Sequence, residues 1–393
     1  MEKNSPPDWD PRSEAVLKDQ MATYDDMRHR CPVAHSRYGY TSLFRHEDVM
    51  RVLKDHETFS SAVSRFPSVP NGMDPPEHTV YRRLIEPYFS PEQMDAFAPE
   101  CRDVAVRLVQ VLPGEGTTEL MGEFAQIFAL QIQCVWLGWP ADLYEPLRLW
   151  TLKNHAATLA RDDVALSAVA LEFDGYIKNL LAVRRTAGNA APDDITTSLL
   201  RNQSLGRPLT DDEIVSILRN WTVGELGTIS ASIGILVHYL AVNSELQQQL
   251  REQPSLLPAA IDEILRIHAP LIMNRRVTTK QVTLGGRALA TGSRIALIWA
   301  SANRDEAVFG DPDEFRLDRD PKLNLLYGAG IHICPGALLA RLELRVVMEE
   351  LLARTSRIAL APDKEPVKAF FPASGFSSLP LHIQKPSSPI LSA

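Results

Sequence analysis

The chain has few cysteines and no long apolar run. Its 393 residues include four cysteines, Cys31, Cys101, Cys134 and Cys334, which are far apart and form no Cys-x-x-Cys pair. This spacing argues against a zinc site or a redox dithiol and favours a reducing compartment. No stretch of about eighteen apolar residues occurs and the first residues are polar, so we expect neither a membrane span nor a signal peptide. These absences predict a cytoplasmic protein.

The chain also lacks a basic run, an alternation of aromatic and basic residues, and a linker rich in glycine or serine. Its formal net charge of −8 opposes binding to phosphate groups, so we expect no nucleic-acid partner. A hydrophobic content of 45% is enough for a large core. We therefore expect one domain over residues 1–393, with flexible tails at about 1–15 and 385–393.

Helical patterns dominate from about Pro91 onward, whereas strand patterns occur near the N-terminus, between Val277 and Ala300, and close to the C-terminus. This distribution predicts a mainly α protein with small peripheral β-sheets. Residues 309–319, rich in Pro, Asp and Gly, predict a long irregular connection.

Three short motifs predict particular elements. Residues 210–213 read Thr-Asp-Asp-Glu, a capping box that predicts a long helix continuing to about Val242. Residues 244–247, Ser-Glu-Leu-Gln, form a second such pattern, so a new helix is expected at once. The glycines at 285–286 and 292 separate short alternating segments and predict β-hairpins.

One glycine-rich stretch carries the strongest chemical signal. Residues 327–336 read Tyr-Gly-Ala-Gly-Ile-His-Ile-Cys-Pro-Gly and lead into an apolar-periodic segment. A cysteine there is held in a loop at the start of a helix, where N–H groups and the helix dipole stabilise a thiolate. Such a thiolate can be the axial ligand of a haem iron, and Gly328, Gly330 and Gly336 allow close approach to a flat macrocycle. The alternative for Cys334 is a buried, inert thiol.

The pattern Phe-x-x-Gly-x-x-x-Cys-x-Gly is the signature of the cytochrome P-450 family. This loop resembles it at each glycine and at the cysteine, with Tyr327 where Phe is usual. The resemblance extends from about Pro32 to Ile383. It implies a single-domain cytochrome P-450 fold, haem b bound through Cys334, and monooxygenase activity. It also implies that His332 donates a hydrogen bond to a haem propionate.

The resemblance further assigns a buried ion pair to Glu263 and Arg266, closed by a later arginine, most simply Arg319. The pattern Glu-x-x-Arg is weak by itself, because an exposed surface pair has the same spacing. Its position 71 residues before Cys334 matches the family. The implied role is structural, to lock the ligand loop.

Two further segments resemble the family's propionate-binding positions. In residues 74–83, His78 and Arg82 lie four apart and share one helical face, so they are expected to bind a propionate. Arg276 resembles the strand arginine that binds the other propionate, although the adjacent Arg275 is an alternative register.

Residues 223–228 of the predicted long helix read Val-Gly-Glu-Leu-Gly-Thr, whereas the family usually shows Gly-x-Asp/Glu-Thr. Thr228 lies 35 residues before Glu263, and the resemblance aligns it with the oxygen-activating threonine. In this register Gly227 occupies the position of the acid.

Two neighbours of Thr228 leave open questions. Glu225 could present its carboxylate on a nearby face and relay protons, or it could be a surface or salt-bridge residue. Gly224 and Gly227 each cost ~1 kcal/mol inside a helix, which the close approach of a bulky group would explain.

By the same resemblance, the substrate pocket is formed by residues 66–73, 150–159, 221–228, 271–274 and 370–377. The residues that make it apolar and partly aromatic are Val223, Gly224, Ile272, Phe370, Phe371 and Phe376. Each aromatic residue could instead be ordinary core. Arg65 is the charge beside these segments. We expect a small, uncharged, aromatic or alkyl substrate.

Residues 31–35, 69–74 and 220–225 look like haem domains that other bacteria fuse to an FMN and iron–sulfur reductase. This implies hydroxylation or O-dealkylation of a small apolar, aromatic compound with dioxygen. No reductase follows in this chain, so electrons are expected from a separate ferredoxin and reductase or from an FMN/2Fe-2S reductase. The protein is expected to be a monomer.

The resemblance places Arg82, Arg83, Arg341 and Arg345 near the ligand side, where they are expected to form a basic patch for an acidic ferredoxin. Two other functions stay open. Because an acid is missing beside Thr228, hydrogen peroxide could replace dioxygen and reductase. The protein could also be a non-catalytic haem sensor.

Overall fold

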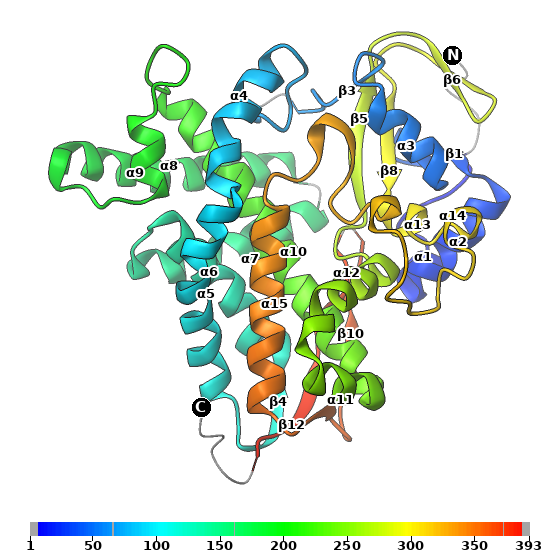
Figure 1. The fold of residues 1–393 in the computed structure, drawn as a ribbon. Helices are drawn as coiled ribbons and strands as arrows, with labels where there is room; N and C mark the ends of the chain where they lie inside the picture. Colours follow the sequence, from blue (N-terminus) through cyan, green and yellow to red (C-terminus); the bar gives the residue numbers. More distant parts are fainter. Residues whose placement is uncertain (1–6, 65–66, 161, 372, 387–393) are drawn as a thin grey trace.

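The computed structural model describes residues 7–64, 67–160, 162–371 and 373–386. Helices form the bulk of the molecule, and the larger β-sheets lie at its periphery, one beside α3 and one at the far end of α15 (Figure 1). The prediction of a mainly α protein with small β-sheets is confirmed.

The helices differ widely in length. The α-helices are α1 (Glu14–Lys18), α2 (Gln20–Arg30), α3 (His46–Lys54), α4 (Glu77–Ile85), α5 (Pro91–Val111), α6 (Gln126–Leu137), α7 (Tyr144–Ala160), α8 (Asp163–Ala187), α9 (Ile195–Arg201), α10 (Asp211–Val242), α11 (Ser244–Glu252), α12 (Leu257–His268), α13 (Trp299–Ala302), α14 (Glu306–Phe309) and α15 (Ala337–Arg354).

The strands are short. Within the described residues they form a five-stranded sheet in the order β1 (Val33–His35), β2 (Tyr40–Leu43), β8 (Arg294–Ile298), β5 (Met273–Thr278) and β3 (Phe59–Ser60), a three-stranded sheet in the order β4 (Glu115–Glu119), β12 (Pro380–Gln384) and β9 (Arg357–Leu360), and the pairs β6 (Val282–Leu284) with β7 (Arg287–Leu289) and β10 (Val367–Lys368) with β11 (Phe376–Ser378).

Helix α10 is the central element and begins where the sequence predicts. The Thr210 hydroxyl accepts from the Glu213 N–H at 3.3 Å, and the Glu213 carboxylate accepts from the Thr210 N–H at 2.7 Å. The helix packs against α6, α8, α12 and α15. By length and composition α10 could cross a membrane, but 61% of its most apolar window is buried inside the protein. It is therefore described best as a core helix.

The second predicted capping box is wrong. Helix α11 does begin at Ser244, but its N-cap residue is Asn243 and makes no side-chain cap. The Gln247 side chain instead donates to the carbonyls of Leu240 at 2.9 Å and Ile358 at 2.8 Å. Because Gln247 is buried against strand β9, tertiary hydrogen bonds take precedence over the local cap.

The predicted hairpin at the paired glycines is confirmed. Strands β6 and β7 are antiparallel, and Gly285 and Gly286 between them have positive φ angles of 51° and 79°, as a two-residue hairpin turn requires. The irregular connection is also present, because the chain between α14 and Pro321 contains neither helix nor strand.

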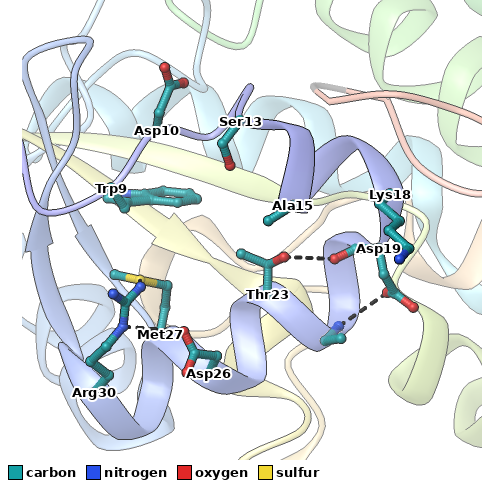
Figure 2. Close-up of a pocket in the computed structure, with 11 residues that line it drawn as sticks. Trp9, Asp10, Ser13, Ala15, Lys18, Asp19, Thr23, Asp26, Met27 and Arg30 are labelled. Atoms are coloured by element: carbon teal, nitrogen blue, oxygen red, sulfur yellow. Dashed lines mark hydrogen bonds and ion pairs between the residues drawn. The ribbon is translucent and has the colours of Figure 1, made fainter.

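The N-terminal segment is packed from Asp8 onward, so the expected flexible tail does not extend to residue 15. The Asp8 N–H donates to the His35 carbonyl at 2.9 Å, and Trp9 is only 7% exposed. A surface hollow of about 410 Å³ lies here between α1 and α2, and no predicted site residue lines it (Figure 2). At the other end, the Lys385 N–H donates to the Gly114 carbonyl at 2.7 Å. Residues 1–6 and 387–393 lie outside the described residues.

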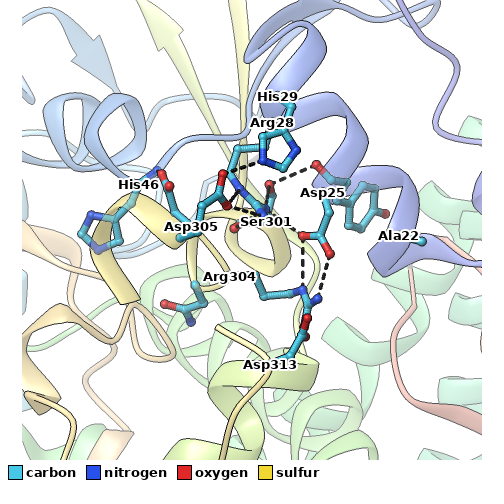
Figure 3. A network of polar contacts seen from close by, with 12 residues as sticks. Ala22, Asp25, Arg28, His29, His46, Ser301, Arg304, Asp305 and Asp313 are labelled. Atoms are coloured by element: carbon cyan, nitrogen blue, oxygen red, sulfur yellow. Dashed lines mark hydrogen bonds and ion pairs between the residues drawn. The ribbon is translucent and has the colours of Figure 1, made fainter. Parts of the chain in front are cut away.

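A polar network joins helix α2 to the segment around α13 and α14 (Figure 3). Arg28 binds Glu306 at 2.9 Å and donates to the Ser301 carbonyl at 3.1 Å. Arg304 binds Asp25 at 2.7 Å and Asp313 at 2.6 Å. The network therefore holds helix α2 against the part of the chain that leads to the cysteine loop.

The network continues into a buried ion triad. Glu263 and Arg266 on α12 form two bonds, at 2.7 and 2.9 Å, and Arg319 reaches the same carboxylate at 2.8 Å. Arg266 also donates to the Asn303 carbonyl at 2.7 Å, next to Arg304. The structure thus brings together the three residues that the sequence grouped. Since Arg319 lies in the irregular connection, the triad fixes the path of the chain before the cysteine.

Replacing Glu263 with Ala would leave Arg266, which is 1% exposed, without its carboxylate partner. We expect the free energy of unfolding to fall by about 3–5 kcal/mol, measured by urea denaturation of the holoprotein. The matched control is Glu314→Ala, because that carboxylate lies 4.0 Å from Arg316 at the surface and should contribute at most about 1 kcal/mol. Equal losses in the two variants would contradict the triad's stabilising role.

Candidate active site

The side chain of Cys334 lies at the end of a tight loop, three residues before α15 begins. Its N–H donates to the Tyr327 carbonyl at 2.8 Å, which closes the loop. Burial raises the pKa of the thiol. Two effects lower it, namely the hydrogen bond from the Gly336 N–H to the sulfur and the positive charges of Arg82 and Arg341. Cys334 nevertheless has an exposed surface, and an N–H group and a helix N-terminus are directed at its sulfur.

Two glycines of this loop are required by its backbone conformation and by its contact with α3. Gly330 has a φ of +72°, and a Cβ there would lie 2.4 Å from the Leu53 carbonyl oxygen at the end of α3. Gly328 has a φ of +75°. At Gly336 an added Cβ would make ordinary contacts with the Phe89 ring and the Cys334 sulfur, at 3.5 and 4.0 Å. Loop shape and contact with α3 thus account for Gly328 and Gly330.

One side of α10 is accessible although most of the helix is buried. Val223, Gly224 and Gly227 are exposed and Thr228 is partly exposed, at positions i, i+1, i+4 and i+5. A Cβ added to either glycine would meet no other atom within 4 Å. These residues, called the α10 stripe below, leave room for a flat ligand against the middle of the helix. The Thr228 hydroxyl donates to the Gly224 carbonyl at 2.5 Å.

Glu225 does not accompany Thr228 on the stripe. Its carboxyl group contacts that of Glu343 on α15, and burial raises the pKa of both groups. The structure therefore places no carboxylate beside Thr228 among the α10 stripe residues. No sequence motif marks Glu343, but a signal existed, because it lies among the buried α15 residues Leu339, Leu342, Val346 and Val347.

Four basic side chains from three segments converge near the loop, and we call them the basic cluster. They are His78 and Arg82 on α4, Arg276 on β5 and His332 in the loop. The charges of other members of the cluster act on each of the two histidines. The two imidazole rings lie 4.2 Å apart. Burial, followed by the charges of His78 and Arg276, lowers the pKa of His332 to about 3, so its ring is neutral at pH 7.

The strand alternation separates the two candidate arginines. Arg276 is 5% exposed and faces the basic cluster, whereas Arg275 is exposed and interacts with Tyr40. Burial lowers the pKa of Arg276 to about 10. Arg82 is already engaged, because it donates to the Ile333 carbonyl at 2.6 Å and binds Glu86 at 3.1 Å. It therefore holds the cysteine loop directly.

The cluster fits a ligand that carries carboxylates. Within the described residues, His78 Nδ1 and His332 Nε2 are buried and have no hydrogen-bond partner. The guanidinium of Arg276 donates at 2.7 Å to the carbonyl of Arg275, the residue before it. Two propionate groups would provide acceptors for these donors. The site thus combines three features that haem requires, which are a sulfur at a helix N-terminus, the open α10 stripe and the basic cluster.

Several predicted pocket residues belong to the core instead. Ile272 has no exposed surface and Phe371 is 9% exposed, both in one apolar cluster with Trp9. Trp150 is buried against Phe173 with ring centroids 4.9 Å apart. The small sheet and α8 pack over these positions, and their place in the substrate pocket stays a prediction.

Phe376 also lies away from the α10 stripe. Its ring is 4.5 Å from that of His238 and lies beside Gly234, six residues beyond Thr228 and so ~9 Å further along α10. Among the described residues of the predicted segments, the exposed large apolar side chains are Leu152 at 50%, Val223 at 50%, Leu271 at 41% and Phe370 at 51%. Arg65 and Phe66 lie outside the described residues.

The arginines expected to form a basic patch are partly neutralised. Arg341 binds Asp262 at 2.9 Å and Arg345 binds Glu349 at 2.9 Å, while Arg83 is exposed. A shallow hollow of about 260 Å³ lies between these α15 arginines, α5 and α12. Arg341 also stacks 4.4 Å above the Tyr327 ring, beside the cysteine loop.

Comparisons with known proteins agree with this geometry. The family model described as cytochrome P-450 matches residues 142–384. Erythromycin C-12 hydroxylase of Saccharopolyspora erythraea is 31% identical over 91% of this chain and 91% of its own, and linalool 8-monooxygenase of Pseudomonas putida is 29% identical over 82% and 84%. A solved structure, a mutant of P-450 EryK in complex with erythromycin B, superposes with a TM-score of 0.85 at 30% identity, covering 96% of this chain and 98% of that one.

Proposed function

The chain belongs to the cytochrome P-450 family, whose monooxygenases bind haem through a cysteine thiolate, and from this premise we propose that Cys334 is the thiolate and Thr228 the proton-handling hydroxyl. The observation that carries the proposal is the convergence of the Cys334 loop, the α10 stripe and the basic cluster. Haem supplies the redox chemistry that activates dioxygen and delivers one oxygen atom to the substrate.

The residues on the sulfur side hold a negative charge. The Gly336 N–H and the positive end of the α15 dipole point at Cys334, so the thiolate form needs no further side-chain donor. At the edge of the site, His78, His332 and Arg276 bind and orient the carboxylates of the cofactor. Neutral imidazoles can do this because each carries one N–H donor.

On the α10 stripe, Thr228 holds a proton at Oγ1. In the structure this proton is donated to the Gly224 carbonyl, so a proton can be passed outward when the hydroxyl exchanges that bond for one to a water or to dioxygen. The same hydroxyl can then accept a replacement proton from ordered water. Gly224 and Gly227 leave the space that this exchange needs.

The substrate in this proposal is a small, apolar, aromatic molecule that undergoes hydroxylation or O-dealkylation. The support is the accessible set of Val223, Leu271 and Phe370, which carries no charge. Two relatives are named for reactions on linalool and erythromycin, so the family accepts substrates of very different size. The electrons come from separate redox proteins, either a ferredoxin with its reductase or an FMN/2Fe-2S reductase. The described cysteines are all unpaired, which agrees with a cytoplasmic location.

A second function is favoured by the position of Glu225. Because its carboxyl group faces Glu343, no acid stands beside Thr228 on the α10 stripe to relay protons from solvent. Hydrogen peroxide brings its own two protons. Peroxide-driven oxygenation is therefore the alternative to reductase-driven turnover.

The first prediction for this function concerns the sulfur ligand. The reduced holoprotein with carbon monoxide should show the strongly red-shifted Soret band of a thiolate-bound haem. Cys334→Ser should abolish that band, because a neutral hydroxyl cannot replace the thiolate, while the control Cys31→Ser should keep it. A parent band like that of myoglobin would refute the assignment of Cys334.

The second prediction concerns substrate class. Methoxytoluene should shift the ferric spin state of the holoprotein, whereas methoxybenzoate should not, because burial of its unpaired carboxylate is costly. Val223→Phe should change the affinity for methoxytoluene by roughly tenfold, since overpacking a contact costs ~1–3 kcal/mol. The control Val242→Phe lies at the exposed end of the same helix and should leave the affinity unchanged. Binding of the carboxylate with equal affinity would exclude the uncharged-substrate proposal.

The third prediction concerns Thr228. In Thr228→Ala, reductase-driven turnover should yield several-fold less product per electron and more hydrogen peroxide, because the proton at Oγ1 is gone. Turnover with added peroxide should fall much less. Ser232→Ala removes another hydroxyl one turn further along α10, which donates to the Thr228 carbonyl at 2.7 Å, and serves as the control. Unchanged coupling in Thr228→Ala would exclude the assigned role.

A further inference from the structure

Two glutamates from facing helices meet in the protein interior. Glu225 lies in the middle of α10 and Glu343 lies in α15, and their carboxyl groups are within hydrogen-bond contact. Glu343 has no exposed surface, whereas Glu225 is partly exposed. The role proposed above uses neither group. We refer to Glu225 and Glu343 as the carboxyl pair.

Three of the four oxygens of the carboxyl pair have no hydrogen-bond donor among the described residues. Glu225 Oε1 and both oxygens of Glu343 are buried without a partner among the described residues. Ionised carboxylates only accept hydrogen bonds, so two of them in contact would leave every buried oxygen unsatisfied. One proton between them creates an O–H···O bond and removes one charge. The same arrangement of two close carboxyl groups sharing a proton is known in acid catalysis.

The surrounding groups do not offset a second negative charge. Those that act on the pair are Cys101 on α5 and, in the ligand loop, Tyr327 and Cys334, all neutral or negative. On the neighbouring helix faces, Arg102 binds Glu349 and Glu350. Arg345 likewise binds Glu349 and is 36% exposed. Both guanidinium charges are therefore already paired with other carboxylates.

The proton belongs on Glu343 and the charge on Glu225. Burial, then the charge of Glu225, raises the pKa of Glu343 far above its ordinary value, while burial raises that of Glu225. Glu225 is the member of the pair with some exposed surface and Glu343 has none, so a charge costs less on Glu225. The charge on Glu225 in turn raises the pKa of Cys334, so it acts on the sulfur.

We propose that Glu225 and Glu343 share one proton and form a positioning pair that joins α10 to α15 and holds a single negative charge near the Cys334 sulfur, where it lowers the reduction potential of the bound haem. This inference rests on the proposed role of Cys334. Neither residue touches the substrate, so both are positioning residues.

The charge has a definite sign of effect. Reduction adds an electron to the haem, and a nearby negative charge opposes it. Removing that charge must make the potential more positive. Both pKa values are raised in the folded state, so the stability contributed by the protonated pair is present at low pH and is lost as pH rises through the folded-state pKa.

The test compares three glutamine variants of the holoprotein by spectroelectrochemical titration. Glu225→Gln leaves Glu343 neutral and buried, so the potential should shift to a more positive value. Glu343→Gln keeps the charge on Glu225, and the glutamine amide donates as the acid did, so the potential should stay close to that of the parent. The control Glu245→Gln removes an exposed charge on α11 and should change the potential much less than Glu225→Gln.

The second readout does not depend on the haem potential. Urea denaturation of the parent should show the contribution of the pair to stability falling as pH rises above 4.5, the ordinary pKa of a glutamate. Glu343→Gln should reduce this fall, because it removes the proton that would otherwise be lost. Should Glu225→Gln fail to fold, this comparison still decides whether the pair holds a proton.

Specific outcomes would overturn the inference. Equal potential shifts in Glu225→Gln and Glu245→Gln would show that the pair carries no charge that the haem senses. Equal shifts in Glu225→Gln and Glu343→Gln would exclude the assigned position of the proton, and identical pH profiles of the parent and Glu343→Gln would exclude the proton itself. Each protein is also examined with carbon monoxide after reduction. If Glu225→Gln shows the thiolate band but no shift in potential, this inference alone is rejected. If the parent protein lacks the thiolate band, the role of Cys334 is rejected.

Discussion

The proposed site depends on stabilising a negatively charged sulfur without a side-chain cation bonded to it. Cys334 meets this requirement through backbone groups, since its loop is closed by the Tyr327 carbonyl and the Gly336 N–H points at the sulfur. Because backbone groups stabilise the sulfur, the loop must follow one particular path. Gly330 against Leu53 fixes one end of that path, and the triad of Glu263, Arg266 and Arg319 fixes the chain that leads into it. Distant elements thus serve one local geometry.

The sequence predicted features that have a local cause. The Thr210 capping box, the glycine hairpin and the cysteine loop all follow from residues within a few positions of each other, and the structure shows each of them. The failures have a tertiary cause. Gln247 matched a capping pattern but is drawn to strand β9. Ile272 matched a pocket segment but is buried beneath the small sheet, because alternation along a strand decides which neighbour faces the site.

The two sides of the site lack different hydrogen-bond partners. Along the edge formed by α4, β5 and the loop, buried donors such as His78 and Arg276 lack protein acceptors, so this edge is complete only with an anionic ligand. Between α10 and α15, Glu225 and Glu343 are acceptors that lack donors. A carboxylate-bearing cofactor satisfies the first side and a proton satisfies the second. Neither deficit is visible in the sequence, because each depends on what other helices fail to provide.

The two glycines of α10 connect these observations. In a helix otherwise filled with buried apolar residues, Gly224 and Gly227 open one face at the position where Thr228 is accessible. Glu225, three residues before Thr228, adjoins that face around the helix, but its carboxyl group meets Glu343 on α15. An acid at the position of Gly227 would share the face of Thr228. Its replacement by glycine therefore gives space to the ligand side and leaves the nearest carboxyl group to act through its charge on the sulfur side.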